Sequence, residues 1–93
     1  MFNAKGYLWS GPYPFGPRST VRAPAFYLIL DADEDPRAVG AVSRDQRGED
    51  VLREQNMNPR SRYLICYQTV TSEDGGEVED RLDFYRELYE IGG

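Results

Sequence analysis

An unbroken apolar run that ends in an acidic turn constrains the fold of this chain more than any other feature. The run AFYLILD, from Ala25 to Asp31, follows Pro24 and is rich in aromatic and branched aliphatic residues, which is typical of a strand buried on both faces. The turn ADEDP comes next, and its aspartates and proline favour a reversal of the chain. RAVGAV, from Arg37 to Val42, then predicts a returning strand, so we expect an antiparallel hairpin.

A short helix is predicted after this hairpin. Val51, Leu52 and the stem of Gln55 lie at helical spacing, which predicts a helix over about residues 48–56. Ser43 and Asp45 precede it and are residue types that cap helices.

A further strand and a longer helix complete the predicted domain. The apolar segment from Tyr63 to Val70 predicts a second central strand. An apolar stripe at steps of four, three and four residues then predicts an amphipathic helix through Val78, Leu82, Tyr85 and Tyr89. Asp74 and Glu77 resemble a capping pair at its start. The predicted fold over residues 25–93 is therefore α+β, in the order β-β-α-β-α, with a mainly antiparallel sheet of three to four strands flanked by two helices.

Residues 1–24 contain four of the six prolines, together with interleaved aromatic residues. Proline removes backbone donors, so we expect an extended N-terminal arm with no central strand past Ser10. Two interpretations are open. The arm packs across the sheet of its own domain, or it offers Trp9, Tyr13 and Phe15 as anchors for a protein partner or a second copy of the chain.

Composition excludes several classes of chemistry. The chain has no histidine, which rules out histidine-dependent catalytic triads. Its single cysteine, Cys66, lies in the apolar run YLICY and is expected to be a buried thiol, because one cysteine can form neither an internal disulfide nor a structural zinc site. No apolar stretch approaches the roughly 20 residues of a membrane span, and the N-terminus lacks the pattern of a secretory signal. We therefore expect a single cytoplasmic domain.

Charge is unevenly distributed along the chain, although the net charge is −5. Residues 37–62 are mildly basic, whereas residues 73–90 contain eight acids against two arginines. Such a chain does not hold duplex DNA by overall charge, so any phosphate contact is expected to be local, through Arg44, Arg47 and Arg53. The acidic tail suggests an alternative function, an inhibitor or immunity-type protein that binds a basic partner.

Asp31, Asp33 and Asp35 have the spacing of the first three ligands of a calcium loop. The rest of that pattern fails, because Pro36 stands where a glycine is needed and Val42 where a bidentate glutamate is needed. These acids are therefore interpreted as a solvated turn.

The order of elements and the spacing of two short motifs resemble the GIY-YIG nuclease family over about residues 25–90. AFY stands at the place of the first motif, with Tyr27 as its tyrosine, and AVG stands at the place of the second, with Gly40 as its glycine. Ten residues, 28–37, separate the two motifs, as in the family.

The resemblance implies a set of site residues. Arg47, or as a second choice Arg44, takes the position of the phosphate-contacting arginine. Glu79, or as a second choice Glu77, takes that of the glutamate that binds Mg²⁺. Tyr27, Arg47 and Glu79 are then the catalytic residues of a metal-dependent endonuclease or phosphodiesterase.

The chain departs from the family pattern at three motif positions. Ala25 and Phe26 replace the first two residues of the first motif, and Ala38 replaces the second tyrosine, whose hydroxyl the family uses. We therefore expect a non-catalytic binding or regulatory module without a cofactor that engages a protein or a nucleic acid; the nuclease and the acidic inhibitor are the alternatives. A purely structural interpretation also applies, in which Tyr27 is a core aromatic and Glu79 lies on the exposed side of a helix.

Overall fold

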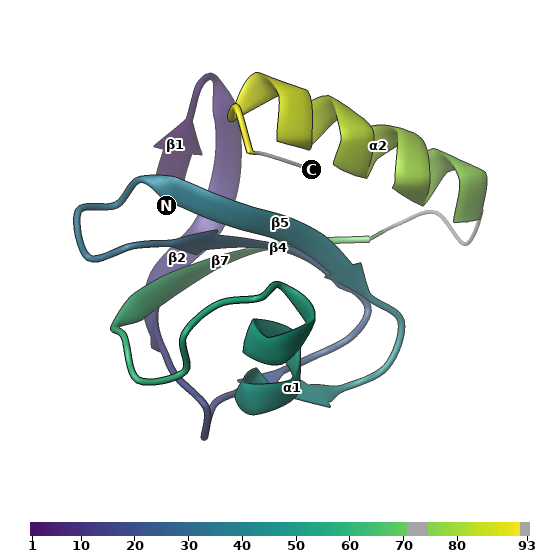
Figure 1. Cartoon of the computed structure of the whole chain (residues 1–93). Helices are drawn as coiled ribbons and strands as arrows, with labels where there is room; N and C mark the ends of the chain where they lie inside the picture. Colours follow the sequence, from purple (N-terminus) through teal and green to yellow (C-terminus); the bar gives the residue numbers. More distant parts are fainter. Residues whose placement is uncertain (71–74, 92–93) are drawn as a thin grey trace.

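The predicted hairpin forms part of a larger antiparallel sheet. The structure is a computed structural model that describes residues 1–70 and 75–91. Its elements along the chain are β1 (Phe2–Ala4), β2 (Tyr7–Phe15), β3 (Thr20–Val21), β4 (Ala25–Leu30), β5 (Pro36–Val42), β6 (Gln46–Arg47), α1 (Gly48–Glu54), β7 (Tyr63–Thr69) and α2 (Gly75–Leu88). The strand order in the main sheet is β1-β2-β7-β4-β5, and β3 pairs with β6 in a separate small sheet (Figure 1). The α+β class and the two helices are confirmed, but the main sheet has five strands instead of three to four.

β4 and β5 form the predicted antiparallel hairpin. Tyr27 lies opposite Gly40, and Ala25 lies opposite Val42. Every residue of β4 is buried, because the strand lies inside the sheet between β7 and β5 and both of its faces are covered. The prediction of a strand buried on both faces is therefore confirmed.

The N-terminal segment is the main correction to the predicted fold. Residues up to Phe15 form β1 and β2, and β2 pairs with β7, so this segment extends the sheet instead of forming a separate arm. Pro12 falls in a register shift between Ser10 and Tyr13. Beyond Trp9, β7 is the only strand among the described residues that pairs with β2. A strand with a free edge tolerates proline.

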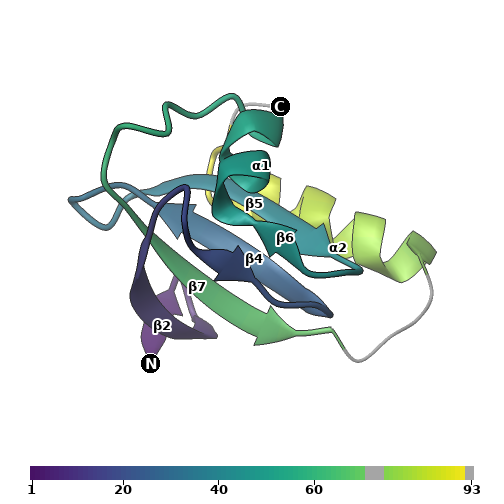
Figure 2. The same cartoon turned by 90° about the horizontal axis from the view of Figure 1, so that it is seen from below.

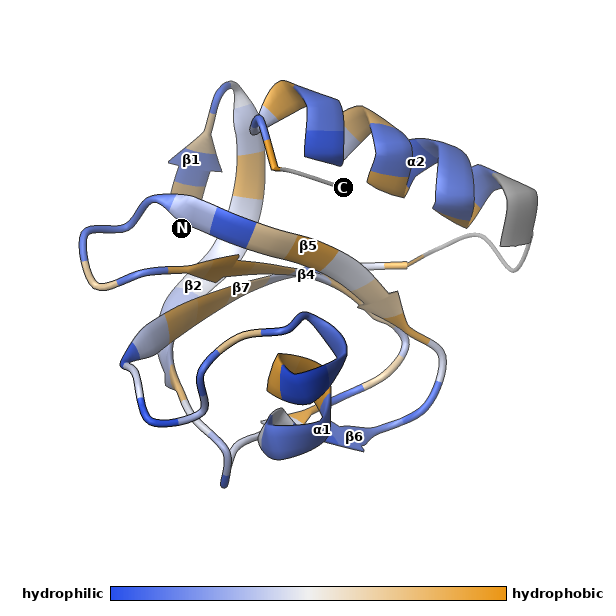
Figure 3. Ribbon diagram, in the orientation of Figure 1, coloured by the Kyte–Doolittle hydropathy of each residue, from blue (hydrophilic) through white to orange (hydrophobic). Residues whose placement is uncertain are grey.

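The sheet separates two apolar layers, one beneath each helix (Figure 2). Successive side chains of a strand point to opposite faces, so Phe26 and Leu28 of β4 face α2, whereas Tyr27 and Ile29 face α1. Hydrophobic colours dominate β4 and β7 in the middle of the molecule (Figure 3). The two helices therefore belong to different faces of the sheet.

Helix α2 lies over the outer strand β5 (Figure 1). Leu82, Tyr85 and Tyr89 are buried against the sheet, which confirms the predicted apolar stripe. Ala38 and Val39 of β5 are also buried although this strand ends the sheet, and an edge covered in this way does not offer itself to other chains. The predicted capping pair involves Asp74, which lies outside the described residues.

Cys66 is fully buried in the layer beneath α2, as the sequence predicted. Burial raises the pKa of its thiol to about 11. Because only the thiolate reacts, we expect a thiol reagent at pH 8 to label the folded protein at least about a hundredfold more slowly than the urea-unfolded protein, given an unperturbed pKa near 8.5. Absorbance of released thionitrobenzoate measures both rates, and equal rates would contradict this burial.

Candidate functional site

Tyr27, the retained tyrosine of the resemblance, is enclosed on the α1 side of the sheet. Its side chain is only 2% exposed, and its hydroxyl accepts a hydrogen bond of 2.7 Å from Nε2 of Gln55, directly after α1. Burial raises the pKa of this hydroxyl. The ring lies over Gly40, where a Cβ atom would overlap with Oη and Cζ of Tyr27. Tyr27 and Gly40 are therefore packing partners.

The three predicted nuclease residues are spread over both sides of the sheet. Arg47 is exposed in β6 directly before α1, on the same side as Tyr27. Glu79 is exposed on α2, which covers the other side (Figures 1 and 2). Ala38, at the position of the missing tyrosine, is buried in the layer beneath α1.

Two of the three predicted aromatic anchors are core residues. Trp9 is completely buried and donates a hydrogen bond of 3.1 Å from Nε1 to the hydroxyl of Tyr89. Phe15 is 5% exposed and packs in the layer beneath α1. The prediction that Trp9 and Phe15 bind a partner is therefore wrong, because β2 belongs to the sheet and turns both side chains inward. Tyr13, at 47% exposure, remains open to solvent.

The start of α1 is capped by backbone groups. Ser43 and Asp45 do not cap it: the N-cap is Arg47, which makes no side-chain capping bond, and Asp45 instead accepts a bond of 2.8 Å from the Ala23 N–H.

Carbonyl groups of the preceding turn satisfy the free N–H groups of α1. The Gly48 N–H donates to the Ser19 carbonyl at 2.6 Å, and the Glu49 N–H donates to the Pro17 carbonyl at 3.1 Å. Gly48 has no room for a side chain, since a Cβ atom there would overlap with the Gly16 carbonyl oxygen. This close contact between α1 and the 16–19 turn brings Arg18 near Arg47.

Two adjoining hollows lie between this turn and the loop after α1. Their volumes are about 600 and 610 Å³, and both are lined by Pro17, Ser19, Pro59 and Arg60. The larger hollow adds Arg18 and Arg47, and the smaller adds Arg62. We call the surface formed by Arg18, Arg47, Arg60 and Arg62 the arginine surface.

No guanidinium group of the arginine surface forms an ion pair within the described part of the chain, although Glu49 also lines the larger hollow. Ion pairs within residues 1–70 and 75–91 join Arg37 to Asp31, Arg53 to Glu49 and Arg86 to Asp83, and none includes a member of the arginine surface. All four members are exposed. Arg44 is exposed as well, whereas Arg53, predicted as a phosphate contact, is paired with Glu49 at 3.0 Å.

The largest group of acidic residues belongs to α2 and the residues directly after it, on the opposite side of the sheet from the arginine surface. Residues 77–90, on α2 and directly after it, contain six acids against Arg81 and Arg86. These acids make up most of the predicted inhibitor-type surface, whose first residues, 73 and 74, lie outside the described part of the chain. The arginine surface and the acids of α2 thus lie on opposite sides of the sheet, whereas Glu49, Asp50 and Glu54 of α1 lie on the side of the arginine surface.

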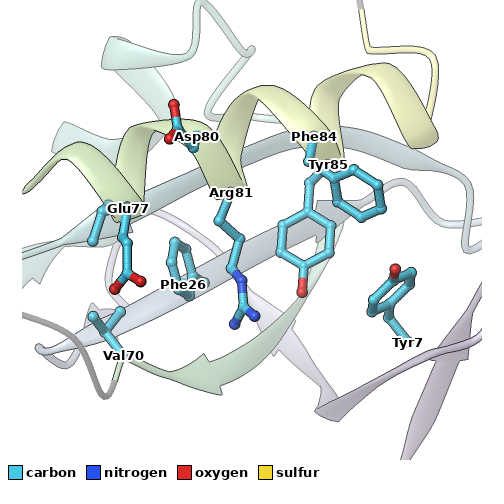
Figure 4. Close-up of a pocket in the computed structure, with 9 residues that line it drawn as sticks. Tyr7, Phe26, Val70, Glu77, Asp80, Arg81, Phe84 and Tyr85 are labelled. Carbon is cyan, nitrogen blue, oxygen red and sulfur yellow. The ribbon is translucent and has the colours of Figure 1, made fainter. Parts of the chain in front are cut away.

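A third hollow, of about 490 Å³, lies under α2 (Figure 4). Arg81 extends from the helix toward the sheet, and its guanidinium carbon lies 5.8 Å from the ring centre of Phe26. The hydroxyl of the neighbouring Tyr85 donates to Oε1 of Gln68 at 2.7 Å. Glu77, the second choice for a metal-binding glutamate, also lines this hollow, as does Asp80, whose carboxylate points away from the sheet in Figure 4.

The acidic turn is organised by its own backbone, as expected for a solvated turn. One carboxylate oxygen of Asp31 accepts the N–H groups of Asp33 and Asp35, and the other pairs with Arg37 at 2.7 Å. The hydrogen bond from Asp35 and the contact with Arg37 lower the pKa of this carboxyl.

Three members of the arginine surface were not predicted as binding residues. Arg18, Arg60 and Arg62 come from two loops that are far apart in the sequence. A weak signal was present, because Arg18 and Arg60 each follow a proline in a loop, at GPR and NPR. A Pro-Arg dipeptide in each loop does not show that the two loops lie close together in the fold.

Comparison with protein-family models, curated proteins and solved structures finds no significant match for this chain. Among the helices in the described residues, none combines the length and the apolar character needed to cross a membrane.

Proposed function

We propose that this chain is a non-catalytic binding module that holds a polynucleotide through its arginine surface. The observation that carries the proposal is the grouping of Arg18, Arg47, Arg60 and Arg62 around two joined hollows, with no carboxylate among the described residues pairing with them. Guanidinium groups bind phosphate oxygens through paired hydrogen bonds, and a phosphate chain engages several of them at once. The acids of α2 lie across the sheet, so they oppose this binding only weakly at physiological ionic strength. Glu49 lines the larger hollow, but its carboxylate is paired with Arg53 at 3.0 Å.

The GIY-YIG-like ancestry is part of the proposal. Its support is the order β4-β5-α1-β7-α2 and the direct pairing of Tyr27 with Gly40, the two motif residues that the chain retains. A non-catalytic role is favoured because the hydroxyl of Tyr27 is buried and hydrogen-bonded to Gln55. The raised pKa of this hydroxyl opposes its use as a general base.

Oligonucleotide binding at several salt concentrations tests the proposal. We expect the double variant Arg47→Ala/Arg60→Ala to bind a labelled oligonucleotide roughly 30-fold more weakly at 0.1 M salt and to lower the slope of log K against log salt by about 1.5, because each lost phosphate contact removes about 0.7 to 0.9 of slope. Fluorescence anisotropy measures both quantities.

A matched control separates local contacts from net charge. The double variant Arg37→Ala/Arg86→Ala removes the same charge from two exposed ion pairs away from the arginine surface, and such pairs contribute little to stability. We expect its affinity to stay within about threefold of the parent, a change of less than about 1 kcal/mol. Equal losses in both double variants, or no oligonucleotide binding by the parent, would contradict the proposal.

The nuclease alternative is tested with the same protein. We expect supercoiled plasmid to remain intact with Mg²⁺. Nicking that requires the metal and disappears in Glu79→Ala would show a catalytic site and overturn the non-catalytic role.

A further inference from the structure

We infer that the polynucleotide is single-stranded and that one of its bases stacks on Tyr13. This inference rests on the proposed function and identifies the form of nucleic acid that the surface accepts. Its basis is the position of an exposed tyrosine between two arginine-bearing hollows on one face of the sheet.

The paired strands β2 and β7 connect these hollows. Phe15 lies opposite Tyr63 at one end of the pair, and both line the hollow that contains Arg60 and Arg62. Ser10 lies opposite Tyr67 further along, and both line another hollow, of about 380 Å³. Tyr67 follows Tyr63 by four residue steps along β7, a distance of roughly 13 Å at about 3.3 Å per residue.

The hollow of about 380 Å³ at the Ser10 end also has groups suited to a sugar-phosphate chain. Arg22 lines it and belongs to none of the ion pairs among the described residues. Its other polar groups include the hydroxyls of Ser10, Thr20, Tyr67 and Thr69. A strand held by Arg60 and Arg62 at one end therefore meets another guanidinium and several hydroxyls at the other.

On β2, Tyr13 lies between Phe15, which lines the hollow with Arg60 and Arg62, and Ser10, which lines the hollow with Arg22. The ring of Tyr13 is held in place but is not covered. Its ring contacts that of Tyr67, with centres 6.2 Å apart and planes inclined by 37°. Its hydroxyl lies 2.9 Å from Oγ of Ser10. Because 47% of the residue remains exposed, the ring offers a pre-oriented surface on which a base can stack.

Stacking on a tyrosine requires an accessible base face. In a duplex the base faces are covered by neighbouring pairs, whereas single strands expose them. The arrangement of guanidinium groups on both sides of one aromatic ring therefore favours a single strand over a duplex.

Binding of matched probes to the full chain tests this inference. The probes are fluorescein-labelled dT and rU strands of about 12 nucleotides, within the usual site size of small single-strand-binding domains, and a DNA duplex of the same length. We expect both single strands to bind at least about tenfold more tightly than the duplex. We expect Tyr13→Ala to weaken single-strand binding by between about fivefold and about 150-fold, given the usual strength of base-aromatic stacking. Tyr13→Phe, which keeps the ring, should remain within about twofold of the parent.

The outcomes distinguish this inference from the proposed function. If the duplex binds as tightly as the single strands, or if Tyr13→Ala binds like the parent while Arg47→Ala/Arg60→Ala is weakened, stacking on Tyr13 is refuted and the arginine surface stands. If no probe binds, the proposed function fails as well. Circular dichroism of Tyr13→Ala should match that of the parent, because the residue is half exposed.

Discussion

Replacing Trp9 by alanine should lower the free energy of unfolding by about 3 to 5 kcal/mol, the usual cost of deleting a buried aromatic side chain. Trp9 is completely buried, its ring centre lies 5.1 Å from that of Tyr85, and its Nε1 donates to Tyr89. The hydroxyl of Tyr89 in turn donates to the carbonyl of Ala4 at 3.0 Å. One substitution therefore removes contacts that join β1, β2 and α2.

Urea unfolding followed by far-ultraviolet circular dichroism measures this loss, since the variant lacks the only tryptophan of the chain. Leu8→Ala is the control. Leu8 precedes Trp9 on β2 but is 57% exposed, so its replacement should change stability by less than about 0.5 kcal/mol. A loss below about 1 kcal/mol for Trp9→Ala would mean that β2 does not pack against α2 and would reopen Trp9 as a binding anchor.

Adding one methyl group at Gly40 should destabilise the protein by about 1 to 3 kcal/mol, the usual cost of overpacking a core. A new Cβ would overlap with the phenol of Tyr27. This effect opposes the usual trend, because glycine to alanine stabilises by about 0.4 to 1 kcal/mol where space and backbone conformation allow it. The sign of the change therefore reports the contact between these two residues.

Gly16→Ala is the matched control, for which we expect a change in stability of the opposite sign or no change. No other heavy atom lies within 4 Å of a Cβ placed at Gly16, so this variant should be as stable as the parent or slightly more stable. In a Tyr27→Leu background the ring is gone, and the cost of Gly40→Ala should fall by at least about 1 kcal/mol, as expected for residues in contact. A cost that is independent of Tyr27 would show that the two residues are not packed together.

This pair also bears on the resemblance to GIY-YIG nucleases. Tyr27 and Gly40 were selected from the sequence as remnants of two catalytic motifs, and they face each other across β4 and β5. The same contact is sufficient to account for both residues as packing partners. The presence of Tyr27 and Gly40 therefore does not distinguish a nucleic-acid-binding module, a nuclease and an unrelated fold. Measurements of oligonucleotide binding and plasmid nicking distinguish them.

Several elements were predictable because their signals are local. The all-apolar run of β4 and the stripe of Leu82, Tyr85 and Tyr89 correspond to buried positions in the structure. Burial of Cys66 followed from its apolar neighbours. The prolines of residues 1–24 misled the prediction, because proline is excluded only where a strand has partners on both sides, and the pairing of β2 is not visible in its own sequence.

The sequence alone determined that β4, β5 and β7 become strands and that α1 and α2 become helices, and that the chain separates a basic middle from an acidic C-terminal helix. Only the tertiary structure decided that Trp9 is core, that Tyr27 and Glu79 belong to opposite sides of the sheet, and that Arg18 meets Arg47 and Arg60. The physical reason is the range of the interactions. Side-chain periodicity and turn chemistry act over a few neighbouring residues, whereas strand order and the face that each helix covers depend on packing between segments far apart in the chain.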